Sequence, residues 1–393
     1  MQYIYVYSGC SPKKYKEYVE SKGIRVQQQA QKYNQLLMEG IVENGVAVDA
    51  VSSRPMNRRV DKRLFFGREK DVENGITYHY VPFINYPVLR NISVFFGVFF
   101  NILFMKTQKE RAMVCDALSI APAFAALLAC KLRGIRTVGI VTDVPCHRPS
   151  NAKVPMHERV NLRLMTKFDG YLLLTEQMND IVNPKGRPYV VLEGHSDIQM
   201  AEVENTLENK YQKRVCLYAG TLRRVYGIEA LVKGFIKADI PDTELHIYGE
   251  GDFRQELEAL AAQVDSVKYM GIAPNAQIVQ SELRCSLLVN PRPTDADYTK
   301  YSFPSKNMEY MASGTPVLTT RLPGMPPEYN EYVFLINEEN EDGICEALKE
   351  IFAHTPEQLH SVGLRAKDFV MREKNNVVQA KKLIGMIAEE MKR

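Results

Sequence analysis

Short runs of apolar residues alternate with longer segments of helical periodicity throughout the first half of the chain. A short apolar run bounded by turn-forming residues is typical of a buried strand, and apolar positions that recur every three or four residues are typical of a helix. The strand-like runs lie at 3–8, 46–51, 112–115, 137–141, 171–174 and 189–192, and the clearest helical patterns lie at 27–43 and 117–133. This alternation indicates a parallel sheet that is covered by helices on both faces.

The pattern weakens at 194–213, where the chain becomes polar and charged, and then restarts. Strand-like runs follow at 215–219, 244–248, 267–269, 285–290 and 316–320, with helical patterns at 228–238, 253–264 and 304–313. The sequence therefore predicts an α/β protein with two doubly wound domains, residues 1–200 and residues 201–393, joined by a polar linker. A last helical pattern at 375–393 could pack on either domain, including back on the N-terminal one.

The composition agrees with two globular domains. The chain has 393 residues, of which 45% are hydrophobic and 25% charged, and this length exceeds what one hydrophobic core usually supports. Its net charge of +3 is too small to indicate nucleic-acid binding over the whole surface. One local cluster is basic, and it predicts either a solvated loop, which we favour, or attraction to a phosphate-bearing acceptor or an anionic membrane. The cluster comprises Arg54, Arg58, Arg59, Lys62 and Arg63.

Cysteine usage and the first residues bear on the cellular compartment. The seven cysteines form no CxxC pair and lie mostly in apolar runs, as the reduced thiols of a cytosolic protein do. The chain begins with a strand-like run and lacks the basic region, apolar core and cleavage site of an export signal. We therefore expect a cytoplasmic protein.

The most apolar stretch lies at 92–105 and carries no charged residue. It is shorter than the roughly 20 residues that are needed to span a bilayer. The interpretation we favour is a core helix of the N-terminal domain. The alternative is a surface helix that meets the inner face of the plasma membrane, which would make the protein peripheral.

Candidate chemistry is concentrated in one late helical segment. Pro304 suits the first turn of a helix, and Gly314 suits the position just past its end. The unpaired N–H groups around Ser305 and Lys306, the helix dipole and the Lys cation together make an anion site that suits a diphosphate. Glu309 lies one turn further along the same side, where its carboxylate can bind ribose hydroxyls.

The same segment carries a family resemblance. The run SFPSKNMEYMASGTPVL at 302–318 is preceded by NPR at 290–292, IYGEGD at 247–252 and YAGTLRRVYG at 218–227. In this order the motifs resemble the C-terminal domain of glycosyltransferase family 4, and the resemblance covers the second half of the chain. It implies a GT-B fold, with two Rossmann-like domains facing a central cleft. It also implies a retaining enzyme of bacterial polysaccharide assembly that uses a nucleoside-diphosphate sugar as donor substrate.

The resemblance further implies which residues bind the donor. Glu309 would bind the ribose, the helix start at Ser305 and Lys306 the phosphates, and Gly271 and Ile272 the base. The loop that follows the strand at 215–219 would approach the pyrophosphate. The full set of implied donor-binding residues is Gly9, Gly220, Arg224, Gly249, Gly271, Ile272, Tyr301, Ser302, Phe303, Ser305 and Glu309.

Two positions depart from the family pattern. The family pairs two Glu residues separated by seven positions, and the partner of Glu309 falls at Tyr301. Sugar recognition at this point must therefore use Tyr301, Ser302 or backbone groups.

The second departure lies in the glycine-rich loop, where many members of the family have an Arg and a Lys. This chain has Thr221 and Tyr226 at those positions. Arg223 or Arg224 could supply the missing positive charge, because a guanidinium binds phosphate with two parallel hydrogen bonds. The sequence does not choose between the two arginines.

The resemblance is weaker in the N-terminal half. Gly9, at the first strand-to-helix turn, would let the backbone approach a phosphate, although an ordinary tight turn explains it equally well. Asp143, at the carboxyl end of a strand, could hold a sugar or acceptor hydroxyl. Relatives often have a histidine just after this strand, where this chain has Thr142 and Asp143, and His147 lies four residues beyond. A structural role explains His147 equally well. The candidate catalytic residues are Asp143, His147, Arg223 and Lys306.

Asp295 and Asp297 spell the D-x-D by which metal-dependent transferases of another fold hold a divalent ion. Here the motif precedes the helix that already suits phosphate, so we expect a solvated acidic loop, no metal site and no cofactor. The family resemblance implies front-face attack by the acceptor, with the leaving diphosphate helping to deprotonate it, and an acceptor that is a glycan or a polyprenyl-diphosphate-linked sugar. Preorganised cations would stabilise the charge that grows on the diphosphate.

Two other functions remain open. An epimerase or phosphorylase of the same fold would use the same nucleotide domain with different catalytic groups, and product analysis separates these enzymes from a transferase. A catalytically silent scaffold for another transferase agrees with the missing acid at Tyr301. Such a scaffold would bind no nucleoside diphosphate.

Overall fold

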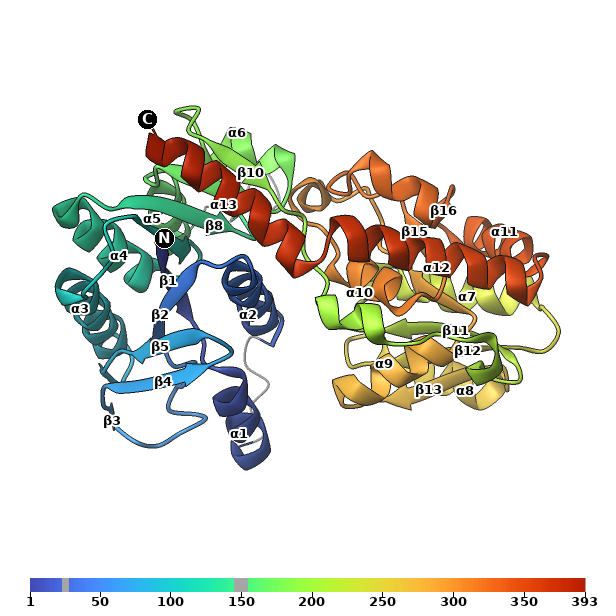
Figure 1. Ribbon diagram of the computed structural model, residues 1–393. Coiled ribbons are helices and arrows are strands. Elements are labelled where there is room, and N and C mark those ends of the chain that lie inside the picture. Colours follow the sequence, from blue (N-terminus) through green and yellow to red (C-terminus); the bar gives the residue numbers. More distant parts are fainter. Residues whose placement is uncertain (23–27, 145–154, 393) are drawn as a thin grey trace. The chain divides into compact units, whose positions relative to one another are not determined.

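The computed structural model describes residues 1–22, 28–144 and 155–392. The chain divides into two compact units, residues 1–195 together with 376–393, and residues 196–375 (Figure 1). We call them the N-terminal unit and the C-terminal unit. Each is built on a largely parallel sheet with helices packed against it, so the predicted class of two doubly wound α/β domains is confirmed.

The main sheet of the N-terminal unit has the strand order β10-β9-β8-β7-β1-β2-β5-β4. Neighbouring strands are parallel, except that β4 runs antiparallel to β5. The strands are β1 (Gln2–Ser8), β2 (Ala47–Ser53), β4 (Glu69–Glu73), β5 (Ile76–Tyr80), β7 (Arg111–Asp116), β8 (Arg136–Val141), β9 (Gly170–Leu173) and β10 (Tyr189–Val191), with a separate antiparallel pair β3 (Phe65–Phe66) and β6 (Phe83–Ile84).

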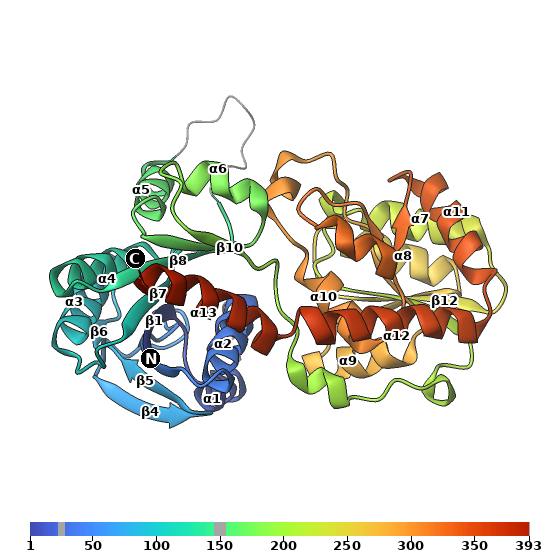
Figure 2. The same cartoon turned by 45° about the horizontal axis from the view of Figure 1, so that its top comes forward.

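Helices cover both faces of this sheet. The helix α2 packs against α13, and α3 packs against α4, and the two pairs lie on opposite sides of the strands (Figures 1 and 2). The helices are α1 (Pro12–Lys22), α2 (Gln28–Glu43), α3 (Leu89–Phe104), α4 (Ile120–Arg133), α5 (Met156–Met165), α6 (Asn179–Val182) and α13 (Asn376–Lys392), with a 3₁₀ turn at Glu176–Met178. The final helix thus belongs to the N-terminal unit.

The helix α3 is only half buried, which corrects the expectation of a core helix at 92–105. Val94, Val98 and Ile102 are buried, whereas Phe96 and Phe100 are about half exposed. A helix that packs on one face of a sheet buries the stripe of side chains that faces the sheet and leaves the opposite stripe exposed. No helix in the described part of the chain is both long and apolar enough to cross a membrane.

The C-terminal unit has a fully parallel sheet with the strand order β13-β12-β11-β14-β15-β16. Its strands are β11 (Arg214–Ala219), β12 (Thr243–Tyr248), β13 (Val267–Gly271), β14 (Leu287–Asn290), β15 (Val317–Thr320) and β16 (Phe334–Ile336). Its helices are α7 (Ile228–Ala238), α8 (Arg254–Gln263), α9 (Asn275–Arg284), α10 (Ser305–Ser313), α11 (Glu341–Phe352) and α12 (Pro356–Glu373), with 3₁₀ turns at Ile198–Glu202, Leu207–Asn209, Arg224–Tyr226, Asp297–Tyr301 and Pro327–Tyr332. Apolar side chains from β11, β12, α7 and α11 form one buried core.

Two sequence features of this unit have clear structural causes. The predicted helix at 304–313 is α10, and Gly314 ends it in the left-handed conformation with φ of 76°.

The polar stretch at 194–213 is packed on the unit rather than extended as a linker. Within it, the buried Asn205 donates hydrogen bonds of 2.8 Å to the Ser313 carbonyl and 3.0 Å to the Thr315 hydroxyl. Its polar side chains therefore bind the end of α10.

The packing of α13 generates a prediction about stability. Leu383 is fully buried on this helix, so Leu383→Ala removes apolar contacts inside the N-terminal unit and should cost about 2–5 kcal/mol. Hydrogen exchange read by mass spectrometry should show faster exchange in residues 1–195. The matched variant Lys381→Ala, at an exposed position of the same helix, should leave exchange unchanged. Unaltered protection of residues 1–195 in Leu383→Ala would show that α13 is not part of that unit's cooperative fold.

Candidate functional site

The strand order of the C-terminal unit reverses between β11 and β14. From β11 the chain continues outward to β12 and β13, and from β14 it continues in the opposite direction to β15 and β16. Ligands of open parallel sheets bind outside the carboxyl ends of the strands at such a reversal. The loops that leave the sheet here are 220–227 after β11 and 291–304 after β14, and the second loop leads directly into α10.

Glycines let these loops approach one another closely. A Cβ atom on Gly227 would lie 2.1 Å from the Pro291 carbonyl oxygen, and one on Gly249 would lie 1.7 Å from the Gly220 carbonyl oxygen. Gly227 and Gly249 also have positive φ angles of 78° and 138°, which side chains disfavour. The Gly249 N–H donates to the Gly271 carbonyl oxygen at 2.9 Å, so the loop after β12 is fixed to the end of β13.

Lys306 reaches from the first turn of α10 to the end of β11. A Cβ atom on Gly220 would lie 1.6 Å from the Lys306 ammonium nitrogen, which shows how closely the side chain approaches this loop. The ammonium donates to the Tyr218 hydroxyl at 3.2 Å and lies 4.7 Å from the centre of its ring. Burial lowers the pKa of Lys306 to about 8; the Glu309 carboxylate opposes this shift, and the Arg292 guanidinium adds to it.

Arg292 is a second cation at this place and was missed as a site residue by the sequence analysis. It lies two residues after the end of β14. Its guanidinium is 5.4 Å from the centre of the Tyr226 ring and 4.8 Å from the centre of the Tyr298 ring. It donates a long hydrogen bond of 3.4 Å to the Ser302 hydroxyl, and its buried Nε has no hydrogen-bond partner among the described residues. The available signal was its position, two residues beyond the carboxyl end of a strand at the reversal.

Within residues 1–22, 28–144 and 155–392, neither Lys306 nor Arg292 forms an ion pair. The Arg292 guanidinium adds to the cost of charging the buried Lys306, and the Glu309 and Glu282 carboxylates offset this cost only in part. A bound anion would offset this cost, because it adds charge-assisted hydrogen bonds to both.

The two arginines between which the sequence did not choose have different surroundings. Arg224 donates to the Glu229 carboxylate at 2.5 Å and also to the Glu256 carboxylate. Arg223 is exposed beside the Tyr226 ring, 5.7 Å from its centre, and has no ion pair within the described part of the chain. The charge of Arg224 is thus neutralised within the protein, whereas that of Arg223 is not.

The remaining donor candidates of this unit lie around the same edge. Ser305 and Glu309 are exposed on α10, Tyr301 and Ser302 are half-buried just before it, and Ile272 is 57% exposed after β13. Phe303 is buried against Tyr329, with ring centres 5.3 Å apart, so its side chain fixes the loop and only its backbone is available to a ligand. Of the D-x-D motif, Asp295 is exposed, and the side chain of Asp297 lies outside the described residues.

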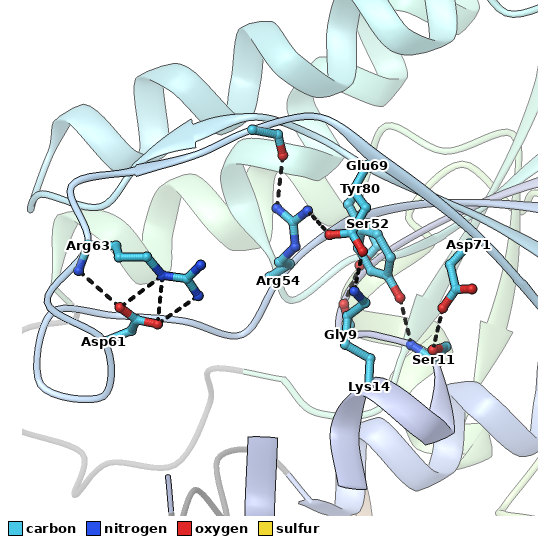
Figure 3. A network of polar contacts seen from close by, with 11 residues as sticks. Gly9, Ser11, Lys14, Ser52, Arg54, Asp61, Arg63, Glu69, Asp71 and Tyr80 are labelled. Atoms are coloured by element: carbon cyan, nitrogen blue, oxygen red, sulfur yellow. Dashed lines mark hydrogen bonds and ion pairs between the residues drawn. The ribbon is translucent and has the colours of Figure 1, made fainter. Parts of the chain in front are cut away.

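The N-terminal unit has its own polar network at the carboxyl ends of β1 and β2 (Figure 3). Arg54 is only 4% exposed; it donates to the Glu69 carboxylate at 2.6 Å and lies over the Tyr80 ring. Lys14 donates to the same carboxylate. Arg54 is therefore a buried cation paired with a partly exposed carboxylate, which corrects the expectation that the whole basic cluster is a solvated loop.

Gly9 lies in this network, and packing explains it. The Ser52 hydroxyl donates to the Gly9 carbonyl oxygen, and the Gly9 N–H donates to the Ser53 carbonyl oxygen at 3.2 Å (Figure 3). A Cβ atom at this position would lie 2.2 Å from the Tyr7 ring. Packing against Tyr7 alone requires a glycine here, and a role for Gly9 in donor binding stays a prediction.

An acid that the sequence analysis missed lies at the strand reversal of the N-terminal unit, between β1 and β7. Asp116 is the last residue of β7, and burial raises its pKa to about 6, although the Leu118 N–H donates to its carboxylate at 3.0 Å. The predicted Asp143 is exposed after β8 and accepts the Val144 N–H at 2.8 Å. The predicted His147 lies outside the described residues.

Comparisons with known proteins bear on the family and the fold. Residues 213–354 match the model of the family described as glycosyl transferases group 1. A search of curated protein sequences finds no match.

Solved structures share the fold over the whole chain. A sucrose-phosphate synthase from Thermosynechococcus elongatus is 14% identical, with a TM-score of 0.66 over 100% of this chain and 99% of that chain. HepE of Anabaena in complex with UDP is 13% identical, with a TM-score of 0.66 over 99% and 100%. A mutant of TarM from S. aureus, in complex with fondaparinux, α-GlcNAc-glycerol and UDP, is 15% identical, with a TM-score of 0.58 over 82% and 64%. The fold is therefore that of GT-B glycosyltransferases. Since residues 213–354 also match a glycosyltransferase family model, the chain is an enzyme of the transferase class.

The raised pKa of Asp116 generates a prediction about stability. Because the folded protein favours the protonated carboxyl, the penalty is absent below the ordinary pKa of 3.8 and complete above about 6. Asp116→Asn keeps an acceptor for the Leu118 N–H, so at neutral pH it should increase the free energy of unfolding by up to about 3 kcal/mol. Urea unfolding measures this gain. The same comparison below pH 3.8 is the control, where a persisting difference would contradict the electrostatic cause.

Proposed function

We propose that the chain is a retaining glycosyltransferase, similar to family 4, that moves a hexose-type sugar from a nucleoside-diphosphate sugar to a glycan or polyprenyl-diphosphate-linked acceptor. The observation that carries the proposal is the pair of neighbouring cations, Lys306 and Arg292, at the strand reversal of the C-terminal unit, which form no ion pair with any described residue. The family match over residues 213–354 supports it. Cell-surface polysaccharide assembly is the process we assign to it.

The diphosphate of the donor is assigned to the loops around Gly220. Lys306 and Arg292 supply positive charge, the first N–H groups of α10 at Ser305 point outward from the helix, and the close loops expose backbone rather than side chains. Arg223 is assigned as the third cation, since its charge is not neutralised by a neighbour. Arg224 then acts by fixing the loop to the two acids that it binds.

The rest of the donor is assigned to the residues around this anion site. Glu309 accepts hydrogen bonds from the ribose hydroxyls, and the base packs on Gly271 and the exposed Ile272. The sugar is held by Tyr301 and Ser302, together with the backbone of the loop before α10. Complexes of HepE and TarM contain UDP, so UDP is the nucleotide to test first.

The chemistry follows from these charges. As the glycosidic bond breaks, negative charge grows on the leaving diphosphate, and cations already held in place stabilise it without reorganisation. The leaving oxygen takes the proton of the attacking acceptor hydroxyl, so the new bond forms on the same face of the sugar. Because side-chain cations neutralise the diphosphate, we expect transfer to continue in the presence of EDTA.

The acceptor is assigned to the N-terminal unit. Asp116 and Asp143 follow strands of its sheet and can hydrogen-bond the acceptor hydroxyl, and His147 stays a prediction. The six described cysteines are all unpaired and buried, which supports a location in the reducing cytoplasm. A lipid-linked acceptor would bring the enzyme to the inner face of the plasma membrane.

Titration calorimetry with UDP, followed by incubation with UDP-sugars and analysis of the products, tests this function. We expect UDP binding and slow release of free sugar of retained configuration when water replaces the acceptor. Absence of binding to any nucleoside diphosphate would favour a silent scaffold. Formation of an epimerised donor or a sugar phosphate would favour the other activities of this fold.

The role of Glu309 predicts a loss of nucleotide affinity. Glu309→Ala removes a charged acceptor of ribose hydrogen bonds, each worth about 1.5–3 kcal/mol, so UDP should bind about 10- to 100-fold more weakly. The unfolding temperature should not change, because the side chain is exposed. Glu346→Ala, at an exposed position of α11, is the matched control and should bind UDP as the unaltered protein does. Unchanged affinity in Glu309→Ala would refute the ribose assignment.

The lowered pKa of Lys306 predicts a pH dependence of donor binding. The free protein loses the ammonium charge above a pH of about 8, whereas a bound diphosphate raises the pKa. UDP-sugar should therefore bind with full affinity below this pH and more weakly above it, with proton uptake on binding. Calorimetry in buffers of different ionisation enthalpy measures the uptake.

Two variants isolate this effect. Lys306→Arg keeps a charge that does not titrate in this range and should remove the proton uptake. Lys306→Met should weaken binding at every pH by about 10- to 100-fold. Proton uptake that persists in Lys306→Met would assign the titration to another group.

A further inference from the structure

One face of the N-terminal unit is apolar and exposed. It comprises outward-facing side chains of α3 and α4, which we call the aromatic face. Its members are Ile92, Phe96, Phe100 and Phe104 on α3 and Phe124, Leu128 and Leu132 on α4. On each helix they recur every four residues and so form a stripe along it. Phe104 is 75% exposed and Leu132 65%, whereas phenylalanine is among the residues most often buried.

The two stripes are side by side. The rings of Phe95 and Phe124 are 5.5 Å apart, and at the other end of the helices the Arg133 guanidinium donates to the Ile102 carbonyl oxygen at 2.6 Å. The helices therefore run in the same direction with their C-terminal ends together, as Figures 1 and 2 show. Phe96, Phe100 and Phe104 add a row of stacked rings with centres 6.1 and 6.2 Å apart. The result is one contiguous patch, which soluble proteins rarely expose without function.

The charged residues of the two helices that form the aromatic face are all basic. Neither α3 nor α4 contains Asp or Glu; Arg90 lies in the first turn of α3, and the other basic residues of this face lie at or just beyond the C-terminal ends of the helices. These are Lys106, Lys109, Lys131, Arg133 and Arg136. The exposed Glu110 lies among them and Arg136 pairs with Glu390 at 3.8 Å, so the remaining excess of positive charge is carried by the lysines and Arg133. An apolar helix face bordered by Lys and Arg is typical of segments that lie in the interface of an anionic bilayer.

A basic pocket opens at the same end, beside Phe104. Arg68, Lys70 and Lys106 line it, and none of these side chains forms an ion pair within the described ranges. The one acid among its lining residues is Asp49, whose carboxylate is bound by the His79 ring at 2.7 Å and the Gln2 amide at 2.5 Å. The pocket is thus positively charged and adjoins the most exposed ring of the aromatic face.

We propose that the aromatic face binds an anionic phospholipid bilayer, with the rings at the boundary of headgroups and acyl chains and a lipid phosphate in the basic pocket. The helices are about 24 and 21 Å long and would lie parallel to the membrane plane. A second copy of the chain would bring the same excess of cations, whereas a bilayer of anionic lipid brings the complementary charge. The proposal concerns membrane attachment and does not depend on the proposed transfer reaction.

Sedimentation of the full chain with vesicles tests the proposal. The chain should bind vesicles of equimolar phosphatidylcholine and phosphatidylglycerol, bind phosphatidylcholine alone much more weakly, and be released by salt. The variant Phe96→Ser with Phe100→Ser should reduce binding at least about tenfold, because it removes apolar surface that enters the interface. Its matched control is Met156→Ser with Val160→Ser, an exposed apolar pair with the same spacing on α5.

The basic pocket has its own variants. Lys70→Gln with Lys106→Gln should reduce binding to the anionic vesicles about 25-fold, since each Lys near such a surface contributes about fivefold. Lys268→Gln with Lys349→Gln, at exposed positions of the C-terminal unit, should have no effect. Equal binding to neutral and anionic vesicles, no binding at all, or full binding by the Phe96 and Phe100 variant would overturn the proposal.

Two further measurements separate this proposal from its alternatives. If the unaltered chain is a dimer in solution and the Phe96 and Phe100 variant a monomer, the aromatic face binds a second copy instead of lipid. UDP binding measured without vesicles should be the same in all variants. A failure of UDP binding would therefore refute the proposed function and leave the membrane result independent of it.

Discussion

The chemistry assigned to this protein depends on two neighbouring cations that form no ion pair in the described part of the chain. Lys306 is desolvated against the end of β11, and the Arg292 guanidinium lies near two tyrosine rings just beyond β14. Burial and Arg292 disfavour the charge of Lys306, and the Glu309 and Glu282 carboxylates compensate for this only in part. The closely packed glycine loops and the start of α10 suit a bound anion, and such an anion would neutralise these cations.

The two units share a topology, but the titratable groups at their strand reversals differ in the sign of their charge. In each unit the strand order reverses once beside the first strand of the unit, and a titratable group with a shifted pKa lies at the carboxyl edge. In the C-terminal unit it is a lysine that burial makes easier to deprotonate, and in the N-terminal unit it is Asp116, which burial makes harder to ionise. A cationic site suits a diphosphate leaving group, and a carboxyl group suits a hydroxyl acceptor.

The aromatic face has a different physical origin from the charged groups at the two strand reversals. It arises because α3 and α4 carry apolar residues around most of their circumference, while the sheet covers only one side of them. Elsewhere in the same unit, packing removes a cation from the surface: Arg54 is buried and paired with the Glu69 carboxylate. The cations that remain beside Phe104 have no such partner in the part of the chain that the structure describes, and this gives the face its charge.

The sequence by itself determined what depends on neighbours along the chain. Apolar periodicity predicted eleven strands of the two main sheets and hence the two α/β domains, although it missed β4, β5 and β16 and the helices α9, α11 and α12. Pro304 and Gly314 predicted the bounds of α10, because capping and φ preferences are local. Only the tertiary structure decided which charges are paired. Arg223 and Arg224 are adjacent in sequence, yet Glu256 lies 32 residues away from Arg224 and binds it, and no local pattern reveals that. The burial of Asp116, the exposure of Phe96 and the meeting of Lys306 with Arg292 likewise depend on packing between distant segments, since burial is a property of the folded surface and not of the residue.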